Sequence, residues 1–362
     1  FSQLYSPTPL CTPSRAGLLT GRHPVRYGLA GNYSEDANYS TEGVFMCDAG
    51  SGLPHSEKTI AQHLNETGYD TYLVGKWHLG HKCDYMPHNY GFKEFFGIPY
   101  AISMGFFDEH SECRELIAQT CPPIPLMLTS RREGEDTCKI LEQPVKRETL
   151  GDIYIDRVEK NIEESIQNDK PFFMFMAFAQ AHADCRSKAF HSKDVFLQDT
   201  EHYKASIDEM DDMTGKIYKI LQEKNLTNDT LIIFASDNGA HVFNPELPDG
   251  SYGYQGSNGQ FSGTYSNYVH QNYNTGKCST WEGGMRIPGF FVWEGRQDII
   301  KPGEISQQVY SLMDILPTTL HLTKSAIPAN LDGINIMPNL YEKEIKNRFI
   351  HYYRGGAFYA IR

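Results

Sequence analysis

The sequence predicts an α/β fold built on a large, mainly parallel or mixed sheet with helices on both faces. Two observations lead to this prediction. Along the 362 residues an amphipathic helix pattern is followed by a strand pattern in three places, and each of these strands is apolar throughout. Strands buried on both faces form continuous apolar runs, which is typical of parallel sheets enclosed by crossover helices.

Three segments carry this helix-then-strand order. In residues 58–77, Ile60 and Leu64 lie on one helical face, and Gly68 ends the helix before an apolar strand. Residues 150–179 repeat the order and end in the strand "FFMFMAFA". Residues 203–239 repeat it again and end in "LIIFASDNG".

Two other segments, residues 80–150 and 240–280, show little regular pattern. The second is rich in Gly, Ser, Asn and Tyr, and we expect both to form irregular surface segments. Cys113 and Cys121 could close a small loop in the first of them, although connectivity does not follow from sequence.

Composition excludes several functional classes. The formal net charge of −12 argues against non-specific binding to nucleic acid or to an anionic membrane. No apolar run reaches the roughly 20 residues that a membrane-spanning helix needs. The longest such run, residues 171–181, has a strand pattern.

The cysteines and glycosylation sequons favour the secretory pathway. The eight cysteines include no C-x-x-C pair, so a zinc ribbon or a thioredoxin motif is unsupported. Together with N-x-S/T sequons, they favour an oxidising compartment, and hence a disulfide-containing glycoprotein that is lysosomal or secreted. The five sequons stand at Asn32, Asn38, Asn65, Asn225 and Asn228.

Polar side chains follow each of the three predicted strands. Lys76 and His78 follow the first, His182 follows the second, and Asp237 and Asn238 follow the third. Ligands collect at the carboxyl ends of the strands in such sheets. We therefore expect these side chains to belong to one functional site.

The run Cys11-Thr12-Pro13-Ser14-Arg15, with Leu19-Thr20-Gly21-Arg22 after it, resembles the signature of the type I sulfatases. The resemblance covers most of the chain and is strongest to the arylsulfatase A and steryl sulfatase branch. It implies the alkaline-phosphatase-like fold of that family. Further blocks match the family in the same order: residues 68–80, 88–100, 231–240 and 275–290.

The resemblance implies that Cys11 is oxidised to formylglycine. In the family, the C-x-P-x-R pattern is recognised in the endoplasmic reticulum by the formylglycine-generating enzyme. Pro9 and Pro13 would keep the chain extended for that enzyme. Without the surrounding motif, a buried free cysteine would be the ordinary interpretation.

The same resemblance implies an arylsulfatase-type hydrolase of sulfate monoesters. One hydroxyl of hydrated formylglycine attacks sulfur to form a covalent sulfo-enzyme, and the other loses its proton as sulfate is expelled. Lys76 and Lys277 would bind the sulfate oxygens, and His78 would contact the formylglycine hydroxyl. His182 would protonate the leaving oxygen. Taken singly, these lysines could be ordinary surface residues, and His182 could make a structural hydrogen bond.

The resemblance also makes Asp237 and Asn238 metal ligands, with Arg15 anchoring formylglycine near the metal. Asp237 would in addition accept the proton of the attacking hydroxyl. Carboxylate and amide oxygens suit Ca²⁺, with Mg²⁺ second, and do not suit zinc. From sequence alone, "SDNG" could equally be a plain turn after a strand.

The sequence departs from the family in three places. The family has two adjacent aspartates upstream of its cysteine, whereas this sequence begins ten residues before Cys11. Ala101 stands where the branch has a serine, and Cys278 stands where glycine is usual. We expect a catalytic domain in residues 1–317 that lacks its first strand, and an incomplete C-terminal subdomain in residues 318–362.

Three functions stay open at this point. The first is a sulfatase, and the second is a non-catalytic relative that binds sulfated ligands. The third is a phosphatase or phosphodiesterase of the same superfamily, against which Cys11 and the two lysines argue. The sequence does not define whether the substrate is an aryl, steroid, lipid or sugar sulfate, nor whether the chain forms a homo-oligomer.

Overall fold

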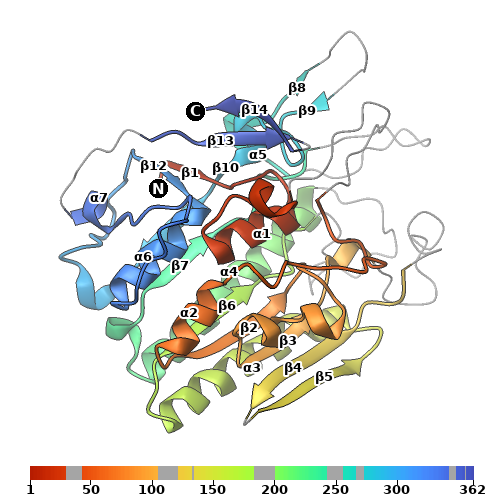
Figure 1. The fold of residues 1–362 in the computed structure, drawn as a ribbon, viewed down its shortest axis with the longest axis vertical. Coiled ribbons are helices and arrows are strands. Elements are labelled where there is room, and N and C mark those ends of the chain that lie inside the picture. Colours follow the sequence, from red (N-terminus) through yellow and green to blue (C-terminus); the bar gives the residue numbers. More distant parts are fainter. Residues whose placement is uncertain are drawn as a thin grey trace. The chain divides into compact units, whose positions relative to one another are not determined.

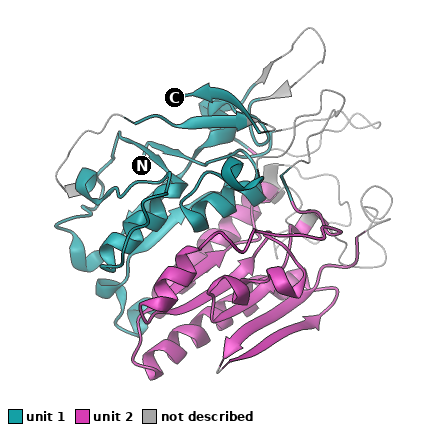
Figure 2. Cartoon of the chain, in the orientation of Figure 1, with its two compact units in different colours: residues 1–44, 221–243, 257–362 teal, residues 45–220, 244–256 magenta. Residues whose placement is uncertain are grey.

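The chain divides into two compact units, each discontinuous in sequence (Figure 2). Unit 1 comprises residues 1–44, 221–243 and 257–362, and unit 2 comprises residues 45–220 and 244–256. The boundary predicted after residue 317 stays a prediction. The computed structural model describes residues 1–29, 43–104, 121–132, 134–182, 200–242, 256–265, 273–341, 348–354 and 356–362.

Unit 2 is built on a five-stranded mixed sheet with the strand order β5-β4-β3-β2-β6 (Figure 1). Strands β3, β2 and β6 run parallel, and β4 and β5 join the β3 edge antiparallel. The elements of this unit are α2 (Ile60–Glu66), β2 (Asp70–Lys76), η2 (Cys83–Tyr85), η3 (Pro87–Tyr90), β3 (Glu94–Ile98), η4 (Ile102–Met104), β4 (Leu126–Arg132), β5 (Glu135–Glu142), α3 (Arg147–Gln167), β6 (Phe172–Ala177) and α4 (Thr200–Glu223), whose last turn belongs to unit 1.

Helices α2 and α3 both pack on β2. Helix α2 begins at a capping box in which the Thr59 hydroxyl accepts a hydrogen bond from Gln62 N–H and the Gln62 side chain accepts one from Thr59 N–H. On the α3 side, the Ser165 hydroxyl donates to the Tyr72 hydroxyl at 3.2 Å. The predicted helix–strand pairs α2–β2 and α3–β6 are therefore confirmed, as are α4 and β7 (Ile232–Ala235) as elements.

The prediction that residues 80–150 are irregular was wrong, because they contain β3, β4 and β5. Strand β5 is an edge strand whose side chains are half-buried or exposed. Its polar sequence therefore lacks the apolar signal of a buried strand.

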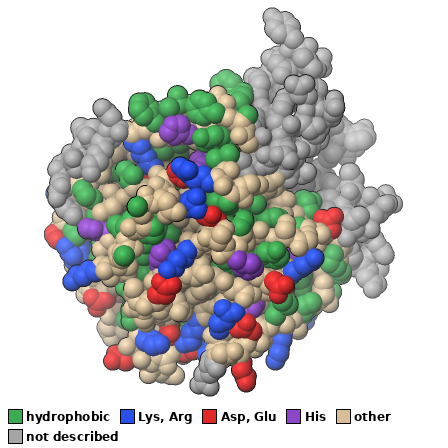
Figure 3. Space-filling model, in the orientation of Figure 1, with side chains coloured by type: hydrophobic (Ala, Val, Ile, Leu, Met, Phe, Trp, Pro, Cys, Tyr) green, Lys and Arg blue, Asp and Glu red, His purple; other side chains and the backbone are tan. Residues whose placement is uncertain are grey.

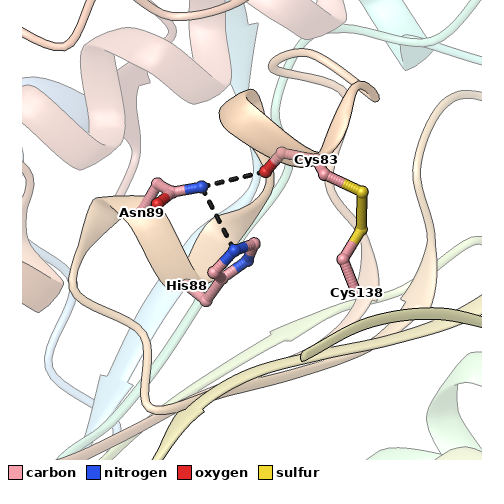
Figure 4. The surroundings of a disulfide bond; sticks show 4 residues. All are labelled: Cys83, His88, Asn89 and Cys138. Carbon is pink, nitrogen blue, oxygen red and sulfur yellow. Dashed lines mark hydrogen bonds between the residues drawn. A yellow bond between two sulfur atoms is a disulfide. The ribbon is translucent and has the colours of Figure 1, made fainter. Parts of the chain in front are cut away.

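Among the described residues of unit 2 there are two disulfides, Cys47–Cys121 and Cys83–Cys138. The suggested Cys113–Cys121 loop was wrong, because Cys121 pairs with Cys47. Figure 4 shows that the second disulfide joins η2 to β5, beside an Asn89 side chain that donates to Cys83 O at 2.9 Å. The segment that follows β2 is thereby attached to the β4–β5 hairpin.

Unit 1 contains a three-stranded sheet with the order β10-β1-β12 and the antiparallel pairs β11–β7, β13–β14 and β8–β9. Strand β1 runs antiparallel to β10 and parallel to β12. The elements of unit 1 are β1 (Gln3–Tyr5), α1 (Cys11–Thr20), η1 (Pro24–Tyr27), η6 (Thr227–Asp229), β7, η7 (Gly259–Phe261), β8 (Thr264–Tyr265), β9 (Tyr273–Asn274), α5 (Glu282–Met285), β10 (Arg286–Ile287), β11 (Gly289–Val292), η8 (Glu294–Arg296), β12 (Val309–Ser311), η9 (Leu312–Asp314), α6 (Ile315–Leu322), α7 (Met337–Tyr341), β13 (His351–Arg354) and β14 (Ala357–Ile361).

The fold class expected from the sequence is confirmed by the mixed sheets with flanking helices, and the solved structures reported below share the fold. No helix among the described residues is long and apolar enough to cross a membrane. Over the face drawn in Figure 3, basic and acidic side chains are interspersed, so neither sign of charge forms a continuous patch there.

A charged network lies between α3 and the sheet of unit 2, and its centre is Glu164. Arg132 donates to both Glu164 oxygens at 2.6 and 2.9 Å, and Lys93 Nζ lies 2.7 Å from Oε1. The Arg132 guanidinium is the main cause that lowers the pKa of Glu164 to about 2, against partial burial, which raises it. The ionised carboxylate therefore stabilises the folded state.

We predict that Glu164→Gln lowers the free energy of unfolding by about 1–2 kcal/mol at pH 7, after allowance for solvent screening. Because the folded pKa is depressed, the stabilisation is complete above the unfolded pKa of about 4.5 and declines as pH falls toward 2. Thermal unfolding of wild type and variant at pH 7, 4 and 3 tests this. Asp156→Asn, an exposed change on the same helix, is the control, and a difference that does not shrink with acid would contradict the prediction.

Candidate active site

Helix α1 presents the motif cysteine and arginine on one face of unit 1. Cys11 is its first residue and Arg15 follows one turn later, so the two side chains share a face. Both are buried. An extended conformation was expected around Pro9 and Pro13. Pro13 is instead helical, because it lies within α1. Pro13 stands in the first turn, where its missing N–H costs no helical hydrogen bond.

Two contacts hold α1 against the end of β7. Arg15 Nε donates to Asp237 Oδ2 at 2.9 Å, and the Ser14 hydroxyl donates to the main-chain oxygen of Asp237. Asp237 directly follows Ser236 at the carboxyl end of β7, where the sequence predicted a functional residue. The guanidinium thus offsets the charge of a partly buried carboxylate.

Lys277 places an ammonium group close to Cys11. Burial alone lowers the pKa of Lys277, but the nearby Cys11 and Asp237 side chains outweigh it, and the pKa is raised. Its loop is fixed by hydrogen bonds from Lys277 N–H to Ala240 O at 2.9 Å and from Cys278 N–H to Pro9 O at 3.0 Å. Unit 1 therefore brings together residue 11, two cationic side chains and one carboxylate.

Asn238 has the properties expected of a ligand for a hard cation. Its side chain is buried, and its Nδ2 donates to Gly239 O at 2.9 Å. Its Oδ1 is buried and accepts no hydrogen bond from the described residues. A buried oxygen without a donor, next to the Asp237 carboxylate, fits Ca²⁺ or Mg²⁺ and does not fit zinc. In the described part of the chain no three His, Cys, Asp or Glu side chains form a metal cluster.

Unit 2 carries Lys76 and His78 at the carboxyl end of β2. Both side chains are buried. His78 adopts a left-handed conformation with φ 66°, its N–H donates to Pro99 O at 3.0 Å, and its Nε2 lies 3.1 Å from Phe45 O. His78 is thus held both through its main-chain N–H and through its imidazole ring.

His182 follows β6, the parallel neighbour of β2. Gly75 of β2 pairs with Ala177 of β6, so both strands end at the same edge of the sheet. The turn after β6 is anchored where Ala181 N–H donates to the Ser206 hydroxyl of α4 at 2.9 Å. Lys76, His78 and His182 therefore lie at or after the carboxyl ends of two neighbouring strands of unit 2, and their functional role stays a prediction.

Sequence reasoning missed two residues of unit 1 that contact this site. Ser14 lies inside the motif, but its bond to Asp237 spans 223 residues and left no local signal. Asn258 hydrogen-bonds the main chain of Ala240 from within a segment expected to be irregular. Asn258 lies in a Gly-rich stretch, and nothing in that stretch of sequence distinguishes it from an ordinary loop residue.

The structure describes both of the positions near the site at which the sequence departs from the family, residues 278 and 101. Cys278 is exposed and has a φ of 72°, a left-handed conformation that favours glycine. Ala101 is buried, so its methyl group is packed. Among the sequons, Asn65, Asn225 and Asn228 are exposed, whereas Asn32 and Asn38 lie outside the described residues.

Comparison with known proteins decides the family. A sequence model of the sulfatase family matches residues 1–325. The chain belongs to the sulfatase family. It is 32% identical to mouse N-acetylgalactosamine-6-sulfatase, over 100% of this chain and 63% of that protein. It is also 32% identical to rat arylsulfatase G, over 99% of this chain and 65% of that protein. The chain thus spans just under two thirds of the length of these relatives.

Two solved structures share its fold. The PsFucS1 sulfatase from Pseudoalteromonas sp. aligns with a TM-score of 0.74 at 27% identity, covering 100% of this chain and 68% of that one. The crystal structure of Ps i-CgsB aligns with a TM-score of 0.69 at 26% identity, covering 97% of this chain and 70% of that one.

We predict that Gly75→Ala disrupts the strand that carries Lys76. Gly75 has a φ of 110°, and an added Cβ would lie 1.9 Å from Ala177 O on the neighbouring strand. We expect a loss of about 3 kcal/mol or more, read as a lower midpoint in thermal unfolding. Gly68→Ala is the matched control, because Gly68 has a φ of 93° but open space around its Cβ, so it should cost only about 1 kcal/mol. Equal effects of the two changes would contradict the prediction.

Proposed function

We propose that the protein hydrolyses sulfate monoesters by means of a formylglycine made from Cys11. The observation that carries this proposal is the position of the Lys277 side chain next to residue 11, beside the ion pair of Arg15 with Asp237. A sulfate ester is an anion that repels nucleophiles, so cationic groups in a water-poor environment must offset its charge. Membership of the sulfatase family supports the same chemistry.

Each side chain then has a distinct task. Lys277 and Lys76 bind sulfate oxygens, and His182 donates a proton to the leaving oxygen. Asp237 takes the proton of the attacking hydroxyl, and His78 holds the hydroxyl at position 11 while sulfate departs. Formylglycine, once hydrated, supplies two hydroxyls on one carbon, one for attack and one for release.

We propose Ca²⁺ as the metal, with Mg²⁺ second. Asp237 and Asn238 would hold it through a carboxylate and an amide oxygen, and Arg15 donates a hydrogen bond to the Asp237 carboxylate beside it. When bound, the cation supplies positive charge close to residue 11.

The substrate class and the compartment are also proposals. The names of the relatives point to sulfated sugars and to aryl sulfates as the first substrates to assay. The two disulfides of unit 2 support an oxidising compartment, which is where the formylglycine-generating enzyme would act on Cys11. We propose a lysosomal or secreted protein.

Peptide mass spectrometry of residues 1–22 from the full-length secreted protein tests the proposal most directly. We expect residue 11 to carry an aldehyde, together with turnover of a chromogenic aryl sulfate. An intact thiol with full sulfatase activity would refute the mechanism. An intact thiol with binding but no turnover would favour a non-catalytic relative, and two bound zinc ions with phosphate ester turnover would favour a phosphatase.

We predict that Cys11→Ser releases at most one equivalent of alcohol product per enzyme molecule. Serine provides one hydroxyl, which can capture the sulfo group but has no second hydroxyl to expel sulfate. Rapid-quench measurement of product per chain tests this. Cys11→Ala is the control and should release none. Repeated turnover by the serine variant would rule out a role for the second hydroxyl.

We predict that Lys277→Met lowers kcat/KM by about 10²–10³-fold, because it removes a cation that stabilises charge on the transferring group. Lys301→Met is the control, because Lys301 is an exposed lysine of the same unit. Steady-state kinetics with an aryl sulfate measures both. A change below about threefold in Lys277→Met, with formylglycine present, would exclude Lys277 from sulfate binding.

A further inference from the structure

The side chain of Asn258 hydrogen-bonds both main-chain groups of Ala240. Ala240 N–H donates to Asn258 Oδ1 at 2.8 Å, and Asn258 Nδ2 donates to Ala240 O at 3.0 Å. A carboxamide can make this double contact because it places one acceptor and one donor side by side. Ala240 lies only two residues after Asn238, so the contact fixes the chain where it leaves the proposed metal ligands.

The carbonyl oxygen of Ala240 also forms a hydrogen bond with the loop that bears Lys277. Ala240 O accepts a second hydrogen bond, from Lys277 N–H at 2.9 Å. The approach is close, since a Cβ at Gly276 would lie 2.3 Å from Ala240 O and 3.0 Å from Asn258 Nδ2. The turn that bears Asp237 and the loop that bears Lys277 thus meet at one carbonyl oxygen, which Asn258 also hydrogen-bonds.

Asn258 is itself held by its own turn. Its N–H donates to the Ser262 hydroxyl at 2.8 Å, and its carbonyl accepts from Phe261 N–H at 3.0 Å. The Thr275 hydroxyl donates to Phe261 O at 2.8 Å, which connects this turn to the start of the Lys277 loop. The carboxamide is therefore presented by an ordered backbone.

We propose that Asn258 is a positioning residue, whose carboxamide holds the Asp237–Asn238 turn in register with the Lys277 loop. This role rests on the proposed sulfatase function. The Asn258 carboxamide contacts the main chain of Ala240, which in turn accepts from Lys277 N–H, so Asn258 acts through the placement of Asp237, Asn238 and Lys277 and not on the reacting atoms. Small displacements of such groups can lower the rate by about a hundredfold.

Replacement by aspartate and by alanine gives a specific kinetic signature. Asn258→Ala removes both hydrogen bonds and should lower kcat/KM by about ten- to a hundredfold at every pH. Asn258→Asp at neutral pH places a carboxylate oxygen against Ala240 O and should be at least as impaired. A protonated carboxyl restores the donor, so the activity of Asn258→Asp relative to wild type should rise about three- to tenfold between pH 7.5 and 4.5.

Amide hydrogen exchange provides a readout that does not depend on activity. The amide of Ala240 is protected by Asn258 Oδ1, so Asn258→Ala should lose protection in a peptide that spans residues 236–242. Gln260→Ala is the local control, because Gln260 is an exposed residue of the same turn and its replacement leaves the contacts of Asn258 in place. Asn330→Ala, an exposed asparagine of unit 1, controls for the loss of an amide as such.

The outcomes separate this role from the proposed function. All variants and wild type are prepared as full-length, formylglycine-containing protein and assayed with one aryl sulfate. Acid recovery of Asn258→Asp alone, with lost Ala240 protection in Asn258→Ala, supports the role. Parallel pH profiles for wild type and Asn258→Asp, or unchanged exchange at Ala240, overturn it while the sulfatase function stands. Absence of turnover in the wild type refutes the sulfatase function and this role with it.

Discussion

The pairing of Arg15 with Asp237 is the interaction on which the site of unit 1 depends. A carboxylate at the end of an apolar strand is costly to bury, and a guanidinium one hydrogen bond away offsets that cost. The arginine can reach Asp237 because α1 begins at Cys11 and places Arg15 one turn later. The same helix turn therefore fixes the position of residue 11 and of the carboxylate that would accept its proton.

Much of the fold follows from local patterns. The α2–β2 and α3–β6 segments carry strong signals, because amphipathic stripes alternate with strands that are apolar along their whole length. The β4–β5 hairpin could not be recognised in this way. Its edge strand contains Glu135, Asp136, Lys139 and Glu142, which are tolerated there because one side of the strand faces water. Cysteine connectivity is equally non-local, since Cys47 and Cys121 are 74 residues apart.

The candidate site was partly predictable for a different reason. Residue types with strong chemistry, such as Lys76, His78 and Asp237, lie at or within two residues of the carboxyl ends of strands, where α/β folds gather ligands. Supporting residues have no such mark. Ser14 and Asn258 act through main-chain oxygens and amides of distant segments, and any polar side chain in a loop has the same appearance in a sequence.

The electrostatics of unit 1 would allow the proposed anionic substrate to bind to a chain with a net charge of −12. At physiological ionic strength, charges on the surface are screened beyond about 8 Å, so the overall charge contributes little inside a buried site. Once residue 11 is an uncharged formylglycine, Arg15 and Lys277 outnumber Asp237 locally, and the Asp237 carboxylate still favours the charged form of Lys277. An anion that approaches residue 11 thus meets a net positive environment before any divalent cation is counted. A cation at Asp237 and Asn238 would increase that charge, so the substrate and the metal would favour each other's binding.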